Sequence, residues 1–296
     1  MSLHIKNIRN KIIYCTIRAY ISLLNLIPRK GALCISSRLG VFAYLIAHDA
    51  RRLTLANLSL IYGGSKSKRA IRELGKKVFW ELGRNFVDVA RMPSISIKNV
   101  DELVTIRGLD NLKSAYGKGK GVIAVSGHLG NFELLGRYLA LKGFNVTVVA
   151  APLYDPHLDS LLLENRAYKG FNVVKKKHAI SAISQALKKG HIVGLLVDQD
   201  TKESGVILPF LGVPARTTIG PAILAARLGS PILPMAIHRK PDDSHLITVK
   251  PPRDLTGRSR EELQKTTINY TKDLEGFIRT VPEQWLWMHD RWQIDQ

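Results

Sequence analysis

The chain has few cysteines and few acidic residues. Cys15 and Cys34 are the only cysteines among 296 residues, and no CxxC pair is present. Two cysteines cannot form the disulfide framework of a small secreted domain, which fits a reducing compartment or thiols without a role. The 24 acidic residues stand against 44 Lys and Arg, so the formal charge is +20. A charge of this size favours an anionic partner: nucleic acid, anionic lipid, a phosphorylated metabolite or an acidic protein.

Motifs for metals, nucleotides and nucleic acids are also missing from the sequence. It has no HExxH or Cys/His zinc spacing, and its nine histidines are scattered. The segment GKGKG at 117–121 precedes an apolar run and matches neither phosphate-loop pattern, so we interpret it as a turn. No RNA-reading signature with interleaved aromatics is present, which makes nucleic acid a minor interpretation. The sequence therefore predicts no metal, no bound cofactor and no nucleic-acid partner.

The N-terminus lacks an uninterrupted run of the roughly 20 apolar residues that a membrane span requires. Residues 12–27 are mostly apolar but contain Arg18, and the first 52 residues hold nine Lys and Arg against the single acid Asp49. This pattern favours helices at a membrane surface, with apolar faces in the acyl boundary and basic groups on anionic headgroups. The alternatives are an ordinary amphipathic bundle helix and one marginal span. No signal-peptide cleavage site follows.

The chain as a whole has globular composition, 45% hydrophobic and 23% charged. Apolar residues at steps of three and four predict one long helix over 66–92, and beyond it short apolar runs alternate with amphipathic segments. We therefore predict an α/β fold with a largely parallel or mixed central sheet flanked by helices, an N-terminal helical membrane-associating segment, and ligands beyond the strand C-termini. The expected strands are 122–125, 146–150, 192–197 and 232–237, with 246–249 as a candidate edge strand. The expected helices are 130–142, 156–169, 179–189, 218–228 and 259–279.

A histidine and a glutamate follow the first predicted strand in the segment GHLGNFE. On one continuous helix His128 and Glu133 would lie on different faces, but they can converge if His128 is in the turn and Glu133 in the first helical turn. A carboxylate that holds an imidazole fixes its tautomer and stabilises the imidazolium, as in a general base. No serine or cysteine elbow accompanies the pair, so we expect the nucleophile to belong to the substrate. For this short pattern alone, a structural turn histidine is the more frequent alternative.

Polar residues also follow the predicted strand at 192–197, where VDQD brings Asp198 and Gln199 to the strand end. Arg166, in LENRAYKGF, is a candidate for holding a phosphate through its planar guanidinium. On local evidence a surface charge on an amphipathic helix is the more frequent reading of Arg166, and the start of a loop is an ordinary reading of Asp198. Only the segments around these residues can support their assignment to a functional site.

Several of those segments together resemble a known family. GHLGNFE, VDQD, PFLGVPARTTIGPAILAARLGSPILP and PEQWLWMHDRW are similar, in this order, to the bacterial lipid A late acyltransferases of the glycerolipid and lysophospholipid acyltransferase superfamily. RRLTLANLSLIYG at 51–63 also resembles that family, so the resemblance covers most of residues 50–292. The glycerol-phosphate branch more often has Asp at the position of Glu133, which favours the lipid A branch and its relatives.

The resemblance implies roles for individual residues. His128 would be the catalytic base and Glu133 its partner. Arg166 would contact substrate phosphate or the acyl carrier, and Asp198, with Gln199 beside it, would help to order the site. Asn131 lies within the motif and is a further candidate for substrate binding.

The resemblance also implies a reaction and partners. A fatty acyl chain would pass from an acyl thioester co-substrate, on acyl carrier protein or CoA, to a hydroxyl of a phosphorylated glycolipid acceptor, a lipid A precursor. Residues 1–50 would associate with anionic lipid on the cytoplasmic face of a bacterial inner membrane, and residues 51–296, with a helical lead-in over 51–92, would form the acyltransferase domain. The alternatives are another acceptor (a lysophospholipid, a phosphatidylinositol mannoside or an amino-acid lipid) and a non-catalytic membrane-binding homologue.

Overall fold

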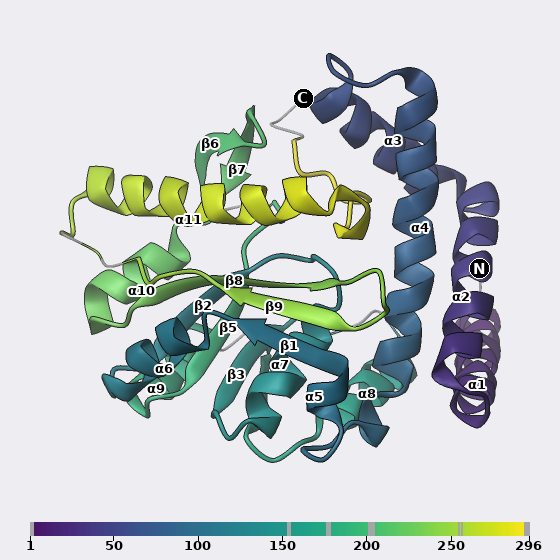
Figure 1. Cartoon of the computed structure of the whole chain (residues 1–296), viewed down its shortest axis with the longest axis horizontal. Coiled ribbons are helices and arrows are strands. Elements are labelled where there is room, and N and C mark those ends of the chain that lie inside the picture. The colour runs from purple at the N-terminus through teal and green to yellow at the C-terminus, as the bar shows by residue number, and fades with distance from the viewer. Residues whose placement is uncertain are drawn as a thin grey trace.

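Four helices form the N-terminal region of the computed structural model, which describes residues 3–152, 155–175, 179–200, 205–253, 255 and 257–292. Pro28 ends the first helix and precedes the second, because proline lacks an N–H for the helix interior but suits a helix start. Figure 1 shows the first two helices side by side on the outer side of the fourth, away from the sheet. The four are α1 (Leu3–Leu26), α2 (Arg29–Ile46), α3 (His48–Tyr62) and α4 (Lys68–Ala90).

Helices α2 and α4 pack with their backbones nearly in contact. A Cβ placed on Gly83 of α4 would lie 2.1 Å from the carbonyl oxygen of Ser36 on α2, so this crossing requires glycine. Among the described residues no single helix is long and apolar enough to cross a bilayer, although α2 and α3, bent by 91°, pass that test of length and composition as a pair. The predicted helix over 66–92 is confirmed as α4, with Ser67 as its N-cap.

Seven strands form the main sheet, in the order β1-β9-β8-β2-β5-β3-β4, and all neighbours are parallel except β8 and β9. The predicted α/β fold with a mostly parallel mixed sheet is confirmed. The strands are β1 (Val104–Arg107), β2 (Val122–Ser126), β3 (Val146–Ala150), β4 (Phe171–Lys175), β5 (Ile192–Leu196), β8 (Ile232–Arg239) and β9 (His245–Val249).

The prediction of an edge strand at 246–249 is wrong. β9 lies between β8 and β1, because Val104 of β1 pairs in parallel with His245. β1 is only four residues long, VTIR, and β4, FNVVK, has no fully buried residue. Such short, half-polar strands carry little apolar pattern, which is why the sequence did not indicate them.

Helices cover both faces of the sheet (Figure 1). The alternate side chains of the fully buried β2 point to opposite faces: Val122 and Ala124 pack into the cluster that holds α7, and Ile123 and Val125 into the cluster that holds α9 and α11. An antiparallel hairpin, β6 (Val206–Phe210) with β7 (Val213–Thr217), lies outside the sheet. The remaining helices are α5 (Val100–Leu103), α6 (Leu109–Gly117), α7 (Phe132–Leu141), α8 (Pro156–Arg166), α9 (Ala179–Lys188), α10 (Gly220–Leu228) and α11 (Arg260–Thr280), with short 3₁₀ turns at Met92–Ser94 and Pro282–Gln284.

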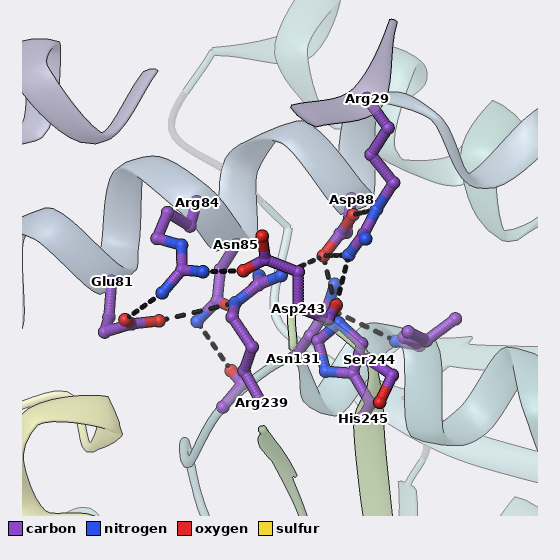
Figure 2. A network of polar contacts seen from close by, with 12 residues as sticks. Arg29, Glu81, Arg84, Asn85, Asp88, Asn131, Arg239, Asp243, Ser244 and His245 are labelled. Atoms are coloured by element: carbon purple, nitrogen blue, oxygen red, sulfur yellow. Dashed lines mark hydrogen bonds and ion pairs between the residues drawn. The ribbon is translucent and has the colours of Figure 1, made fainter. Parts of the chain in front are cut away.

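A buried ionic network joins the N-terminal helices to the sheet (Figure 2). Asp88 of α4 accepts hydrogen bonds from Arg29 of α2 at 2.8 and 3.0 Å, and from His245 of β9 at 3.0 Å. It also pairs with Arg239 of β8, whose side chain is 1% exposed, at 2.8 Å. Burial would raise the pKa of Asp88, but the hydrogen bonds from His245 and Arg29 and the charge of Arg239 hold it well below its usual range.

We expect Asp88→Asn to lower the free energy of unfolding by about 3–5 kcal/mol, because it removes the nearer counter-charge of the buried Arg239, at 2.8 Å, and leaves, among the described residues, only Glu81, at 3.4 Å. The ionised Asp88 stabilises the fold fully above about pH 4, the ordinary aspartate pKa, and this contribution is lost as the pH falls further. Urea unfolding at neutral pH checks the first point, and the gap between wild type and variant should narrow in acid. The control is Asp242→Asn, which removes an exposed pair with Lys240 and should change stability little.

Candidate active site

The turn between β2 and α7 carries His128, and two glycines give the turn its shape. A Cβ on Gly127 would lie 2.8 Å from the Asp198 Oδ2 atom. Gly130 has φ +56°, and a Cβ there would meet the carbonyl oxygen of Ile237 at 2.2 Å. Asn131 caps α7, since its Oδ1 accepts a hydrogen bond from the Leu134 N–H at 3.1 Å. The backbone therefore turns sharply enough to present the His128 side chain at the strand end.

The carboxylate that holds His128 belongs to Asp198, directly after β5. The His128 Nδ1 donates to Asp198 Oδ1 at 2.8 Å, and the His128 backbone N–H donates to Oδ2 at 2.6 Å. The indole N–H of Trp285 also donates to Oδ2, at 2.7 Å. Asp198 is 1% exposed, whereas the His128 side chain is 19% exposed. Parallel pairing of β2 with β5 brings the two strand ends together.

These contacts fix both the charge of Asp198 and the tautomer of His128. Burial alone would raise the pKa of Asp198, but the hydrogen bonds and charge of His128 and the Trp285 hydrogen bond lower it below its usual value. An ionised carboxylate only accepts, so His128 carries its proton on Nδ1. The lone pair of Nε2 is then free for a proton from another group, as a general base requires.

Glu133 does not hold His128, contrary to the expectation from the sequence. It lies in the first turn of α7, where its carboxylate pairs with the guanidinium of Arg166 at the end of α8. The Arg166 Nε donates to Glu133 Oε2 at 2.9 Å, and Nη2 donates to Oε1. The two side chains are only 11% and 12% exposed. Arg166 is therefore part of a forked, nearly buried ion pair and not a surface charge of an amphipathic helix.

An apolar cavity opens beside this pair, between α7 and the sheet. It measures about 650 Å³ including its open mouth, and its polar lining comes from Ser126, Glu133 and Arg166. Phe132, whose ring packs edge-on against the His128 imidazole at 5.1 Å, also lines it. The other lining residues are apolar: Ala124, Leu135, Gly136, Leu139, Val146, Val148, Val149, Phe171, Ile192, Gly194, Leu195, Leu196 and Met235. The cavity suits a hydrocarbon chain with a polar group at one end.

The C-terminal segment PEQWLWMHDRW forms the other wall of the turn. The Leu286 N–H donates to the His128 carbonyl at 3.1 Å, and the Gly130 N–H donates to the Gln284 carbonyl at 2.9 Å. Asn85 of α4 donates to the Gly130 carbonyl at 3.0 Å and accepts from Arg239 at 3.0 Å, which connects the turn to the Asp88 network. Trp285 and Trp287 are buried in the core, 2% and 0% exposed.

Sequence reasoning gave no site role to Trp285 or Asn85. Trp285 lies in a segment that the resemblance indicated, but nothing in the sequence says which of its tryptophans reaches a carboxylate. Gln199 follows Asp198 in the loop after β5 and is half-buried. The basic run KKKH at 175–178 is a candidate solvated loop or contact for an acidic partner, and its residues 176–178 lie outside the described residues. In the described part of the chain, no group of three His, Cys, Asp or Glu side chains is arranged to hold a metal.

Comparison with known proteins identifies the family of this chain. The family described as "Bacterial lipid A biosynthesis acyltransferase" matches residues 3–294. A phosphatidylinositol mannoside acyltransferase of Mycobacterium tuberculosis H37Rv is 30% identical over 158 residues, 51% of this chain and only about half, 50%, of that protein. Two Escherichia coli K12 proteins match more of their length. The lipid A biosynthesis palmitoleoyltransferase is 28% identical, and the match covers 88% of this chain and 84% of that protein. The lipid A biosynthesis lauroyltransferase is 24% identical, and the match covers 86% of this chain and 83% of that protein. Since the family match runs over nearly the whole sequence, the chain belongs to the bacterial lipid A biosynthesis acyltransferase family.

Proposed function

We propose that this protein transfers a fatty acyl chain from an acyl thioester to a hydroxyl of a lipid acceptor. The observation that carries the proposal is the His128–Asp198 pair beside the apolar cavity. The cavity holds the acyl chain, and its polar end leaves the thioester carbonyl near the imidazole. The acceptor hydroxyl is then the nucleophile, and no covalent acyl-enzyme is needed.

In the proposed reaction, His128 Nε2 removes the hydroxyl proton as the acceptor oxygen attacks the thioester carbonyl. Asp198 stabilises the resulting imidazolium. The C–O bond forms, the C–S bond breaks, and the imidazolium returns its proton to the leaving thiolate. We propose that the positive end of the α7 helix dipole stabilises the developing oxyanion.

Arg166 and Glu133 take a different role from the one the sequence suggested for Glu133. Because Glu133 binds the Nε and Nη2 edge of Arg166, the guanidinium is held in one orientation at the polar end of the cavity. We propose that Arg166 binds an anionic group of the donor or acceptor and that Glu133 positions it. We propose that Asn131 acts through the α7 cap and that Gln199, next to Asp198 in the sequence, contacts substrate.

The acceptor we favour is a phosphorylated glycolipid of the lipid A precursor type, with acyl carrier protein or CoA as donor. The two Escherichia coli lipid A acyltransferases support this choice because they match more than four fifths of this chain. A second candidate acceptor is a phosphatidylinositol mannoside, supported by the 30% identity to the Mycobacterium tuberculosis protein. Lysophospholipids and amino-acid lipids are further acceptors to test.

The experiment is an incubation of purified protein with radiolabelled acyl-acyl carrier protein or acyl-CoA and a panel of these acceptors. We expect an acylated lipid A precursor as the main product. If only the phosphatidylinositol mannoside is acylated, the proposed acceptor is wrong but the proposed acyl transfer reaction is supported. Failure to acylate any member of the panel, by a folded protein, would support the non-catalytic homologue.

We propose a location at the cytoplasmic face of a bacterial inner membrane, attached through α1 and α2. Arg9, Lys11, Arg18, Lys30 and Arg38 are exposed on these helices. Large apolar side chains are exposed beside them, 42–82% each: Ile12, Ile13, Leu23, Leu26, Ile35, Leu39, Phe42, Leu45 and Ile46. We call this set the basic apolar face. Such a surface fits the boundary between anionic headgroups and acyl chains.

Binding to vesicles should therefore depend on salt. Each basic side chain near an anionic surface contributes about 1 kcal/mol, and this attraction is screened as ionic strength rises. We expect the affinity for phosphatidylglycerol-containing vesicles to fall at least about tenfold between roughly 50 and 500 mM salt in a sedimentation assay. Vesicles of phosphatidylcholine alone are the control and should bind weakly at both concentrations. Binding that salt leaves unchanged would favour a membrane span, such as the bent α2–α3 pair.

A further inference from the structure

A second apolar groove lies in the N-terminal helices, apart from the cavity between α7 and the sheet. It has a volume of about 760 Å³ including its open side, and none of the described residues lines both the groove and that cavity. Ala43 and Ala47, with Ala50 of α3, line one wall, and Leu82 and Phe86 of α4 line another. Met288 of the C-terminal segment also lines the groove. The walls are almost entirely hydrocarbon. Because the alanine side chains are small, the groove is wider at these positions than it would be with larger residues.

Two elements that line this groove, α4 and the C-terminal segment, also contact the catalytic turn. Phe86 follows Asn85, whose amide donates to the Gly130 carbonyl. Met288 lies between Trp287 and His289, and the Asn57 amide fixes both of their carbonyls, at 2.7 and 2.8 Å. His289 is near enough to Asp198 and His128 for their charges to affect its own pKa, which burial lowers. Two separate elements thus connect the groove to the site.

The other side of the groove is continuous with the basic apolar face. Leu39 of α2 belongs to both, being 47% exposed and lining the groove. Leu45 and Ile46, which directly precede Ala47 at the bend between α2 and α3, are 53% and 58% exposed. From Lys6 to the acid at Asp49, residues 6–48 contain seven Lys and Arg and no Asp or Glu. The groove therefore lies between a surface suited to anionic lipid and two elements, α4 and the C-terminal segment, that contact the turn of His128.

We infer that this groove binds one acyl chain of the anionic lipid that presents the acceptor hydroxyl. The inference rests on the proposed function, because transfer to a lipid brings two hydrocarbon chains to one site. The cavity between α7 and the sheet takes the chain that is transferred. The groove takes a chain that stays on the acceptor, so the headgroup hydroxyl reaches His128 while the lipid remains in contact with the membrane surface.

Photolabelling tests this assignment without requiring turnover. The probe is phosphatidylglycerol with a diazirine at the end of one chain, in vesicles with phosphatidylcholine, and labelled peptides are identified by mass spectrometry. We expect label on the peptide that contains Met288, besides the peptides of the basic apolar face. Ala43→Phe should reduce the Met288 label by roughly tenfold, because the ring takes the space of several methylenes. The label on α1 should remain.

Leu45→Phe is the matched control, since Leu45 is exposed beside the groove and does not line it. In this variant the probe should label the Met288 peptide to the same extent as in the wild type. Ala47→Leu is the second variant if Ala43→Phe does not fold by circular dichroism, and it should reduce the label in the same direction. Absence of label on Met288 in the wild type, or equal label in a folded groove variant, would overturn the inference. If Met288 is labelled but the protein acylates none of the acceptors, the groove binds a lipid chain and the proposed function is refuted.

Discussion

His128→Ala should lower kcat/KM for acyl transfer at least about a hundredfold, since general base catalysis contributes typically 10²–10⁴-fold. The variant removes the imidazole that Asp198 holds, and with it the acceptor for the hydroxyl proton. The His128 side chain is partly exposed, and the contacts of its ring include Phe132 and the Asp198 carboxylate, so we expect the variant to fold. Initial rates of acyl transfer with saturating donor measure the effect.

His191→Ala is the control for this loss. His191 lies just before β5, at the opposite end of the strand from Asp198, and its ring contacts the Thr147 hydroxyl at 3.1 Å. It should keep near-normal activity. A purified, folded His128→Ala protein that transfers acyl chains at the wild-type rate would disprove the assignment of His128 as the base.

Asp198→Asn should lower kcat by about 10²–10⁴-fold with little change in KM for the donor, because the amide keeps the size of the side chain but removes the charge that stabilises the imidazolium. The low pKa of Asp198 means that the wild-type carboxylate stays ionised above about pH 4, the ordinary aspartate value. The loss should therefore be present across the neutral range. Because His128 and Asp198 act as one unit, the double variant should be little worse than either single variant.

Glu133→Gln separates the two carboxylates. If Glu133 positions Arg166 and does not touch His128, its variant should chiefly raise KM for the substrate whose anionic group Arg166 binds. Arg166→Lys should act in the same way, because an ammonium cannot make the forked contact. A loss of kcat in Glu133→Gln as large as in Asp198→Asn, with the same KM, would instead make Glu133 the partner of His128.

The fold could be predicted from the sequence wherever a buried strand is continuously apolar. Strands β2, β3, β5 and β8 carry such runs, and at least one helix separates each of them from the next, which is enough to indicate a parallel sheet. The sequence did not predict the strands β1 and β4 or the β6–β7 hairpin, because they are short, half-exposed or contain proline. Pro209 and Pro214, for example, face each other in the hairpin.

The sequence by itself determined which residues belong to the candidate site: His128, Asp198, Glu133 and Arg166 lie in the segments it singled out, each at the end of a strand or helix. Only the tertiary structure decided their partners. Glu133 is five residues from His128, but helix α7 turns it toward α8 and Arg166, while Asp198, 70 residues away, meets the imidazole because β5 pairs in parallel with β2. Spacing along the chain limits which side chains can meet, but strand pairing and helix direction fix which ones do.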